Sequence, residues 1–243
     1  MGAQVKAEWI KARSLRSTWV IVGLSVVGVI AQAITALAGH GSDSAATTQD
    51  VMSGSGFTLV LMVVIGAMIT ATEYSQKSII STYTANPNRM RVVLAKAVVI
   101  VAIGLVVGAI SVPLSRLVAA IWFAFGSGSW DAGVGTAIHY AYGTMLAYAG
   151  FGILGVMIGL LCRSTAIGVG IAFAAIFVVD PLLGAISLYS DYSLTGISNT
   201  LTDPNSHQTA SQPAFGSAIA LLVLYAIVLG LIAIAIEETR DVD

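Results

Sequence analysis

The placement of basic residues between six long apolar runs is the feature that most limits how this chain can fold. The runs cover residues 19–38, 57–72, 97–125, 137–161, 166–189 and 215–236. The gaps at 39–56, 126–136 and 190–214 contain no Lys or Arg. Ten of the eleven basic residues lie before the first run, in the other gaps, or after the last run: Lys6, Lys11, Arg13, Arg16, Lys77, Arg89, Arg91, Lys96, Arg163 and Arg240. Because short loops rich in Lys and Arg stay in the cytoplasm, this alternation predicts an even number of membrane crossings with both termini inside.

The composition supports the same interpretation. The chain is 57% hydrophobic and only 9% charged, whereas about a quarter of the residues in a soluble domain are charged. The surplus apolar surface therefore has to face lipid, and each run is close to the roughly 20 helical residues that cross a bilayer. We predict an all-α polytopic membrane protein that forms a single transmembrane domain over residues 1–243, with six transmembrane helices.

The segments outside the runs complete this prediction. Residues 1–18 are expected to be cytoplasmic, either as a helix lying on the inner leaflet or as charge that merely orients the first crossing. Residues 73–96 form a cytoplasmic loop, and residues 237–243 form a cytoplasmic tail. Polar and apolar residues mix between 182 and 199, which predicts short or re-entrant helices at the outer face between the fifth and sixth crossings.

Most catalytic chemistry is missing from the sequence. No phosphate-binding loop of the form GxxxxGK[ST] occurs. The three histidines, His40, His139 and His207, fall at or beyond the outer boundary, away from any serine nucleophile within the membrane. They share no short ligand spacing with Cys or carboxylates, so we expect no metal site. The net charge of −1 argues against a nucleic-acid partner. An intramembrane enzyme, or a scaffold or channel acting alone, remains the alternative to a transport function.

Two charged residues fall inside predicted crossings. Arg116 lies twenty residues after Lys96, and Asp180 lies seventeen residues after Arg163. At about 1.5 Å per helical residue, both reach the outer third of the bilayer. One hypothesis is an Arg116–Asp180 charge pair that joins the third helix to the fifth. The alternative is that Arg116 extends toward the outer interface and Asp180 caps the end of a short fifth helix.

Small residues and two prolines predict local features of the helices. Gly104 and Gly108, and Gly155 and Gly159, have the GxxxG spacing that lets helix backbones approach closely. These spacings indicate packing faces, with a subunit interface as one option. Pro113 and Pro181 have no N–H to donate to the carbonyls of Ala109 and Phe177, so each should open its helix at that point, the third and the fifth.

The most informative polar stretch runs from Glu73 to Lys96. Ile79, Ile80 and Tyr83 would form one compact apolar patch on a short helix. The sequence Asn86-Pro87-Asn88 then stops that helix, and the cations that follow return the chain to the membrane. Such a cytoplasmic projection suits insertion into a groove on a partner. For Glu73, the options are a carboxylate solvated at the inner interface or a fixed contact that orients this segment.

Here the sequence resembles the membrane (permease) subunits of bacterial ATP-binding-cassette exporters of the second type, the ABC-2 family. The resemblance covers nearly the whole chain. It rests on Glu8-Trp9-Ile10-Lys11, on Ser17-Thr18-Trp19, on the Glu-Tyr-x3-Ser segment that starts at Glu73, on the turn from Pro87 into Ala95-Lys96, and on the six helices.

The resemblance implies a function and partners. The chain would be a multi-pass transport subunit of the bacterial cytoplasmic membrane, without an enzymatic activity or cofactor of its own. ATP and magnesium would bind to two copies of a separate ABC ATPase, and two permeases, identical or related, would form the path. The substrate would be hydrophobic or amphiphilic: a lipid, a peptide or a drug. A coupling helix within residues 73–91 would contact the ATPase through Glu73, Tyr74, Lys77, Ile79, Ile80, Tyr83, Arg89 and Arg91.

Overall fold

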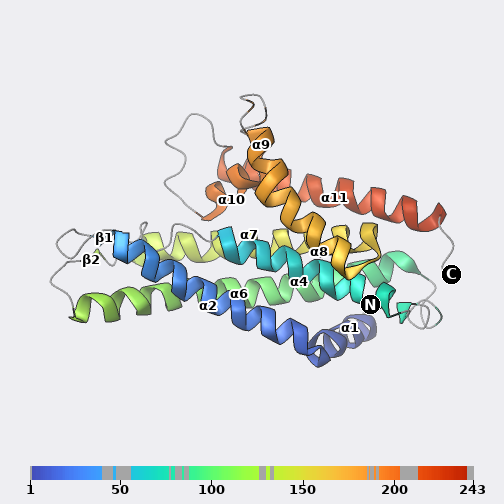
Figure 1. Cartoon of the computed structure of the whole chain (residues 1–243), viewed down its shortest axis with the longest axis horizontal. Helices are drawn as coiled ribbons and strands as arrows, with labels where there is room; N and C mark the ends of the chain where they lie inside the picture. Colours follow the sequence, from blue (N-terminus) through green and yellow to red (C-terminus); the bar gives the residue numbers. More distant parts are fainter. Residues whose placement is uncertain are drawn as a thin grey trace.

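The computed structural model describes residues 2–39, 46–47, 56–76, 78–79, 84, 88–125, 130–131, 134–184, 186, 189, 192–202 and 213–239. Apart from two short strands, the regular elements of these ranges are helices (Figure 1). They are α1 (Gly2–Ser14), α2 (Arg16–Gly39), α4 (Gly56–Ser75), α6 (Arg89–Phe125), α7 (Val134–Cys162), α8 (Thr165–Ala174), the π-helix η1 (Ala175–Val179), α9 (Asp180–Gly184), α10 (Leu194–Thr202) and α11 (Phe215–Thr239). Six spans are long and apolar enough to cross a membrane, with α8, η1 and α9 together forming the fifth. This confirms the predicted six-helix membrane fold.

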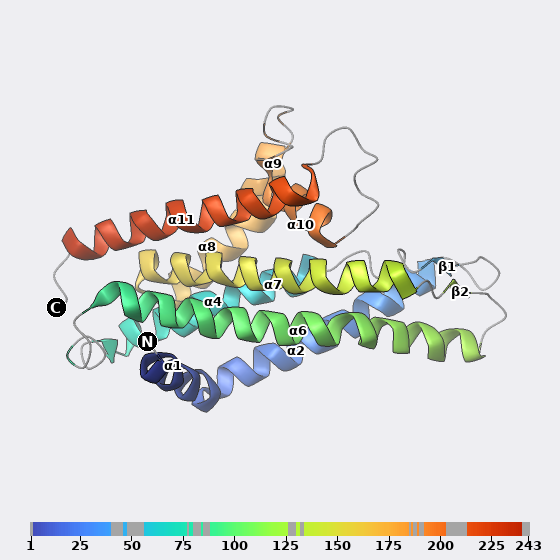
Figure 2. The ribbon, with the colours of Figure 1, turned by 180° about the vertical axis from the view of Figure 1, so that it is seen from behind.

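The two ends of the bundle differ as the basic residues predict. The start of α1, the end of α11 and the turn between α7 and α8 lie at one end (Figures 1 and 2). At the opposite end, β1 (Ala46–Thr47) pairs in parallel with β2 (Trp130–Asp131). These two strands come from the first two gaps that lack Lys and Arg. Within the described residues, these two gaps thus lie at the end opposite to the start of α1 and to the α7–α8 turn that holds Arg163.

Glycines let three helices pack closely in the core, where α4 is the most enclosed of the six spans. A Cβ added to Gly155 of α7 would lie 2.1 Å from the carbonyl oxygen of Val63 in α4, and one at Gly159 would lie 2.6 Å from that of Ala67. A Cβ added to Gly104 of α6 would lie 2.7 Å from the backbone nitrogen of Ala149 in α7. The predicted GxxxG faces are therefore used within this chain, so their spacing does not mark a subunit interface.

The end of the second crossing and the start of the third differ from the predicted boundaries. Helix α4 continues to Ser75, so Glu73 and Tyr74 lie on its last turn. Helix α6 begins at Arg89 instead of at residue 97, because the side-chain oxygen of Asn88 accepts a hydrogen bond from the backbone N–H of Arg91 (3.1 Å). Asn at this position satisfies one of the free N–H groups at a helix start. Arg89, Arg91 and Lys96 therefore belong to a helix and not to a loop.

The fifth span slants across the others and changes its helical form before Pro181 (Figure 1). The π-helical turn Ala175–Val179 directly precedes Asp180 and Pro181, which agrees with the expected opening at Phe177. The opening expected before Pro113 was wrong, since α6 continues as one helix through that residue. After α9, the chain forms the short helix α10, which packs against α7 so closely that a Cβ at Gly143 would overlap the carbonyl of Leu201.

Asp180 caps the start of α10. Its carboxylate accepts hydrogen bonds from the backbone N–H of Leu194 (2.6 Å), the backbone N–H of Thr195 (2.9 Å) and the hydroxyl of Thr195 (2.6 Å). The side chain is buried. Among the ion pairs formed by the described residues, none joins Asp180 to Arg116, which is half-buried on α6. Asp180 therefore acts as a helix cap, as the second hypothesis predicted. The helix that it caps is α10, however, and not the fifth span.

We expect Asp180→Ala to lower the free energy of unfolding by about 1–2 kcal/mol, the usual cost of losing a helix cap. Asp180→Asn keeps an oxygen that can accept the backbone bonds and should retain most of the stability. Unfolding of both variants in detergent measures this difference. Equal losses for Asn and Ala would show that the negative charge matters, as a pair with Arg116 requires, and would contradict the capping role.

Candidate functional site

Four charged side chains meet at the end of the bundle that holds the start of α1 and the end of α11. Lys96 of α6 contacts Glu8 of α1 (Nζ–Oε2, 2.8 Å) and Glu73 of α4 (Nζ–Oε1, 2.9 Å). Lys11 of α1 contacts the same two carboxylates, at 2.9 Å from Glu8 Oε1 and 3.1 Å from Glu73 Oε1. We call these four residues the ion network. It joins the N-terminal helix to the end of the second crossing and the start of the third.

The ion network is largely closed off from solvent. Lys96 is 1% exposed, Glu8 is 2% exposed and Glu73 is 8% exposed. Two positive and two negative charges cancel, so no net charge is buried. Removing water from such charges is costly, and it is offset only when every charge keeps its partners. The three helices therefore have to stay in register for the network to remain satisfied.

Lys11 is the member of the network nearest to solvent. Burial lowers its pKa, but its hydrogen bond and charge interaction with Glu8, together with the charge of Glu73, outweigh this effect, and the pKa is raised above its usual value. A raised lysine pKa contributes stability that is complete below the unfolded value of about 10.4 and is lost as the pH rises through the folded value. Lys11 therefore keeps its charge throughout the neutral range.

One carboxylate oxygen of Glu73 takes no part in the ion network. Its Oε2 atom is buried and accepts no hydrogen bond from the described residues. Its Oε1 atom, in contrast, contacts both lysines. A buried carboxylate oxygen without a donor is costly. This atom is an acceptor at the point where the chain leaves α4 for the segment that was predicted to dock on a partner.

The residues next to Glu73 are tied to the turn between α7 and α8. The guanidinium group of Arg163 lies 5.4 Å from the ring centre of Tyr74, a cation–π distance. Arg163 has a positive φ of 51°, the left-handed conformation that ends α7. The hydroxyls of Ser75 and Thr165 are 3.0 Å apart. The last turn of α4 is thus held by α1, by α6 and by the start of the fifth span.

The other predicted coupling residues have different outcomes. Ile79 is only 2% exposed, so in this conformation its side chain is covered by this chain instead of forming part of an exposed patch, and its role in coupling stays a prediction. Arg91 is exposed at the start of α6. Lys77, Ile80 and Tyr83 lie outside the described residues, as does the side chain of Arg89.

Sequence reasoning singled out Glu73 but not its partners. A signal for them was present in the helical spacing. Lys96 lies in a buried stripe with Val92, Val93, Val99 and Ile100, at intervals of three and four residues. A lysine inside such a stripe needs an internal partner. Glu8 occupies the same kind of position in α1, four residues before the buried Ala12.

A separate cavity of about 490 Å³ lies deeper in the helical bundle. Its walls are mainly apolar side chains of α4, α7, α8 and α11, including Phe151, Ile171 and Val228. Tyr189, Tyr225 and Cys162 supply its few polar atoms. This volume is within the usual range of ligand pockets, and the lining suits an apolar molecule or the apolar part of an amphiphile.

Comparison with known proteins agrees with this architecture. A sequence model described as "ABC-2 family transporter protein" matches residues 4–179, which contain all four residues of the ion network. A comparison with curated proteins gave no match. Proteins of this family are transport subunits of the membrane, typically the bacterial cytoplasmic membrane. With its six crossings and the match over most of its length, this chain belongs to the ABC-2 family of transporter proteins and is a multi-pass permease subunit.

Proposed function

We propose that this chain is the permease of an ATP-driven exporter and that movements of a separate ABC ATPase reach it through residues 73–91. The observation that carries this proposal is the ion network: Glu73, at the start of that segment, is fixed to α1 by Lys11 and to α6 by Lys96. A displacement of residues 73–91 would therefore move α1, α4 and α6 together instead of only bending a loop.

The packing of α4 supports the next step. Its last turn holds Glu73, and its remaining length packs along α7 through Gly155 and Gly159 and also contacts α8. Displacement of Glu73 would thus be passed to the helices that line the 490 Å³ cavity. ATP and magnesium would act in the partner, and nucleotide would shift the permease only if the docking contacts differ between its two states.

The cavity favours a hydrophobic or amphiphilic substrate, because its walls are mainly apolar. Exposed apolar side chains along α8 and α11 would face lipid or a second permease copy. We therefore propose two permeases and two ATPases in the complete exporter. The described residues contain no group of three or more potential metal ligands, and His139 is exposed at the outer end of α7. An intramembrane enzyme, or a scaffold or channel acting alone, is the alternative to this transport function.

Glu73→Gln tests the coupling role. The substitution keeps the shape of the side chain but removes the charge that both lysines contact. In proteoliposomes that contain the permease with its ATPase, we expect ATP hydrolysis to fall on the order of tenfold, the middle of the usual range of coupling energies. Because Ile79 is buried, this variant is a more direct test than truncation of the apolar patch.

Lys6→Gln is the matched control, since it also removes one charge, and Lys6 is exposed on α1 outside both the ion network and residues 73–91. It should leave the rate unchanged. If no ABC ATPase co-purifies with the unmodified permease, the proposed partnership fails. If the ATPase is bound and Glu73→Gln hydrolyses ATP at the normal rate, the partnership stands and the coupling role of the network is wrong.

A further inference from the structure

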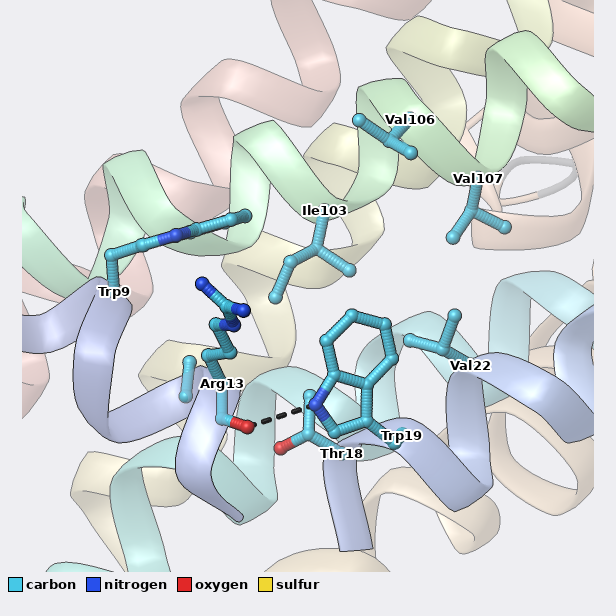
Figure 3. Close-up of a pocket in the computed structure, with 9 residues that line it drawn as sticks. Trp9, Arg13, Thr18, Trp19, Val22, Ile103, Val106 and Val107 are labelled. Carbon is cyan, nitrogen blue, oxygen red and sulfur yellow. Dashed lines mark hydrogen bonds between the residues drawn. The ribbon is translucent and has the colours of Figure 1, made fainter. Parts of the chain in front are cut away.

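A second cavity lies outside the ion network, where α1, α2 and α6 meet (Figure 3). Its volume is about 100 Å³. The lining residues are Trp9, Ala12, Arg13, Thr18, Trp19, Val22, Ile103, Val106 and Val107. Most of these side chains are apolar, and the guanidinium group of Arg13 lies beside Trp9 and Ile103 at the edge of this space (Figure 3). The cavity is thus an apolar slot with one cation at its rim.

The slot is fixed in place by the bend between α1 and α2. The indole N–H of Trp19 donates a hydrogen bond to the carbonyl oxygen of Arg13 (2.8 Å; Figure 3). This bond satisfies one of the free carbonyls at the end of α1. Trp9 and Trp19 are 42% and 58% exposed. Exposed tryptophans at the end of a transmembrane bundle are typical of the level of the lipid headgroups.

The acidic and basic residues of this region differ in their exposure to solvent. Glu8, the acidic residue of α1, is buried, and Lys11 contacts it and Glu73. Lys6, Arg13 and Arg16, in contrast, are exposed, and none of them takes part in the ion pairs of the described residues. The exposed charged residues that the structure describes at this bend are therefore all cationic, although the buried ion network next to them is neutral.

We propose that this slot binds an anionic phospholipid of the inner leaflet, with the phosphate at Arg13 and the upper part of one acyl chain between Ile103, Val106 and Val107. The charge of Arg13 complements an anionic headgroup, and Trp9 and Trp19 place the site at headgroup depth. Free phosphate would leave the apolar walls without a partner. A docked protein segment is not favoured, because the slot opens at the level of the membrane interface.

Such a lipid would contact α1 on the side that faces away from the ion network. Glu8 and Lys11 on the inner side of the same helix contact Lys96 and Glu73. Bound lipid therefore stabilises the position of α1 against both α2 and α6. The inference about binding does not depend on the proposed coupling to an ATPase.

Tryptophan quenching by brominated lipid tests the site. In a background with Trp122→Phe and Trp130→Phe, the remaining indoles are Trp9 and Trp19, both at the slot. The full-length permease is placed in nanodiscs that contain brominated phosphatidylglycerol or, at the same minor fraction, brominated phosphatidylcholine. We expect stronger quenching by the anionic lipid. Arg13→Gln should reduce the preference roughly fivefold, the effect of one cation near an anionic surface.

Two matched controls separate the slot from general surface charge. Lys6→Gln removes an exposed cation of the same helix that does not line the slot, and it should retain most of the preference. Val106→Phe fills the slot and should reduce quenching, whereas Val98→Phe, at another exposed position of α6, should not. The proposal is overturned if Arg13→Gln and Lys6→Gln act equally, if the two lipids quench the unmodified slot equally, or if inorganic phosphate removes the preference.

Discussion

Replacing Lys96 by Met should lower the free energy of unfolding by about 3–5 kcal/mol, the cost of breaking a buried ion pair by removing one partner. Lys96 is 1% exposed and contacts Glu8 and Glu73 at 2.8 and 2.9 Å. Without it, two buried carboxylates share Lys11 alone, and a net negative charge remains inside the helix junction. Unfolding of the purified permease in detergent, followed by tryptophan fluorescence, measures the loss.

A second substitution distinguishes charge imbalance from loss of packing. Adding Glu8→Gln to Lys96→Met restores neutrality, because Lys11 then pairs with Glu73 at 3.1 Å. The double variant should therefore be more stable than Lys96→Met alone. Arg91→Met, which removes an exposed cation five residues earlier on α6, is the control and should change stability by less than about 0.5 kcal/mol. If Lys96→Met and Arg91→Met have the same effect, the network does not stabilise the junction.

The six crossings and the position of the first two gaps without Lys and Arg were predictable from sequence, because both follow from where apolar runs and cations lie along the chain. The opening before Pro181 was predictable, since a residue without an N–H affects the carbonyl four residues earlier, whereas the same rule predicted an opening before Pro113 that α6 does not show. These features depend on the sequence alone. None of them requires knowledge of which helices become neighbours.

The partners of Glu73 were not predicted, because they depend on which helices come together. Glu8 and Lys96 are 88 residues apart in sequence, and Lys96 was interpreted as one of several charges of a cytoplasmic loop. Asp180 shows the same limit: its depth was estimated from helix length, but its hydrogen bonds come from α10, which starts fourteen residues later. Ile79 was interpreted as exposed, because a local apolar patch does not reveal whether its own chain covers it.

Gly155→Ala should be the other strongly destabilising change, by about 1–3 kcal/mol or more, because an overfilled core has to displace its neighbours. The added Cβ would lie 2.1 Å from the carbonyl oxygen of Val63, and a backbone atom cannot rotate away as a side chain can. Helices α4 and α7 would have to separate, which would also disturb the wall that both give to the 490 Å³ cavity.

Gly170→Ala on α8 is the matched control for this prediction, since no atom lies within 4 Å of its added Cβ. Ala is the better helix former, so this variant should be unchanged or up to about 1 kcal/mol more stable. Both variants are compared in the same detergent unfolding measurement. Equal stability of the two would mean that the close approach of α4 and α7 does not restrict residue 155. A loss confined to Gly155→Ala would establish that this contact, between the helix that carries Glu73 and the helix that lines the cavity, is rigid enough to transmit a displacement.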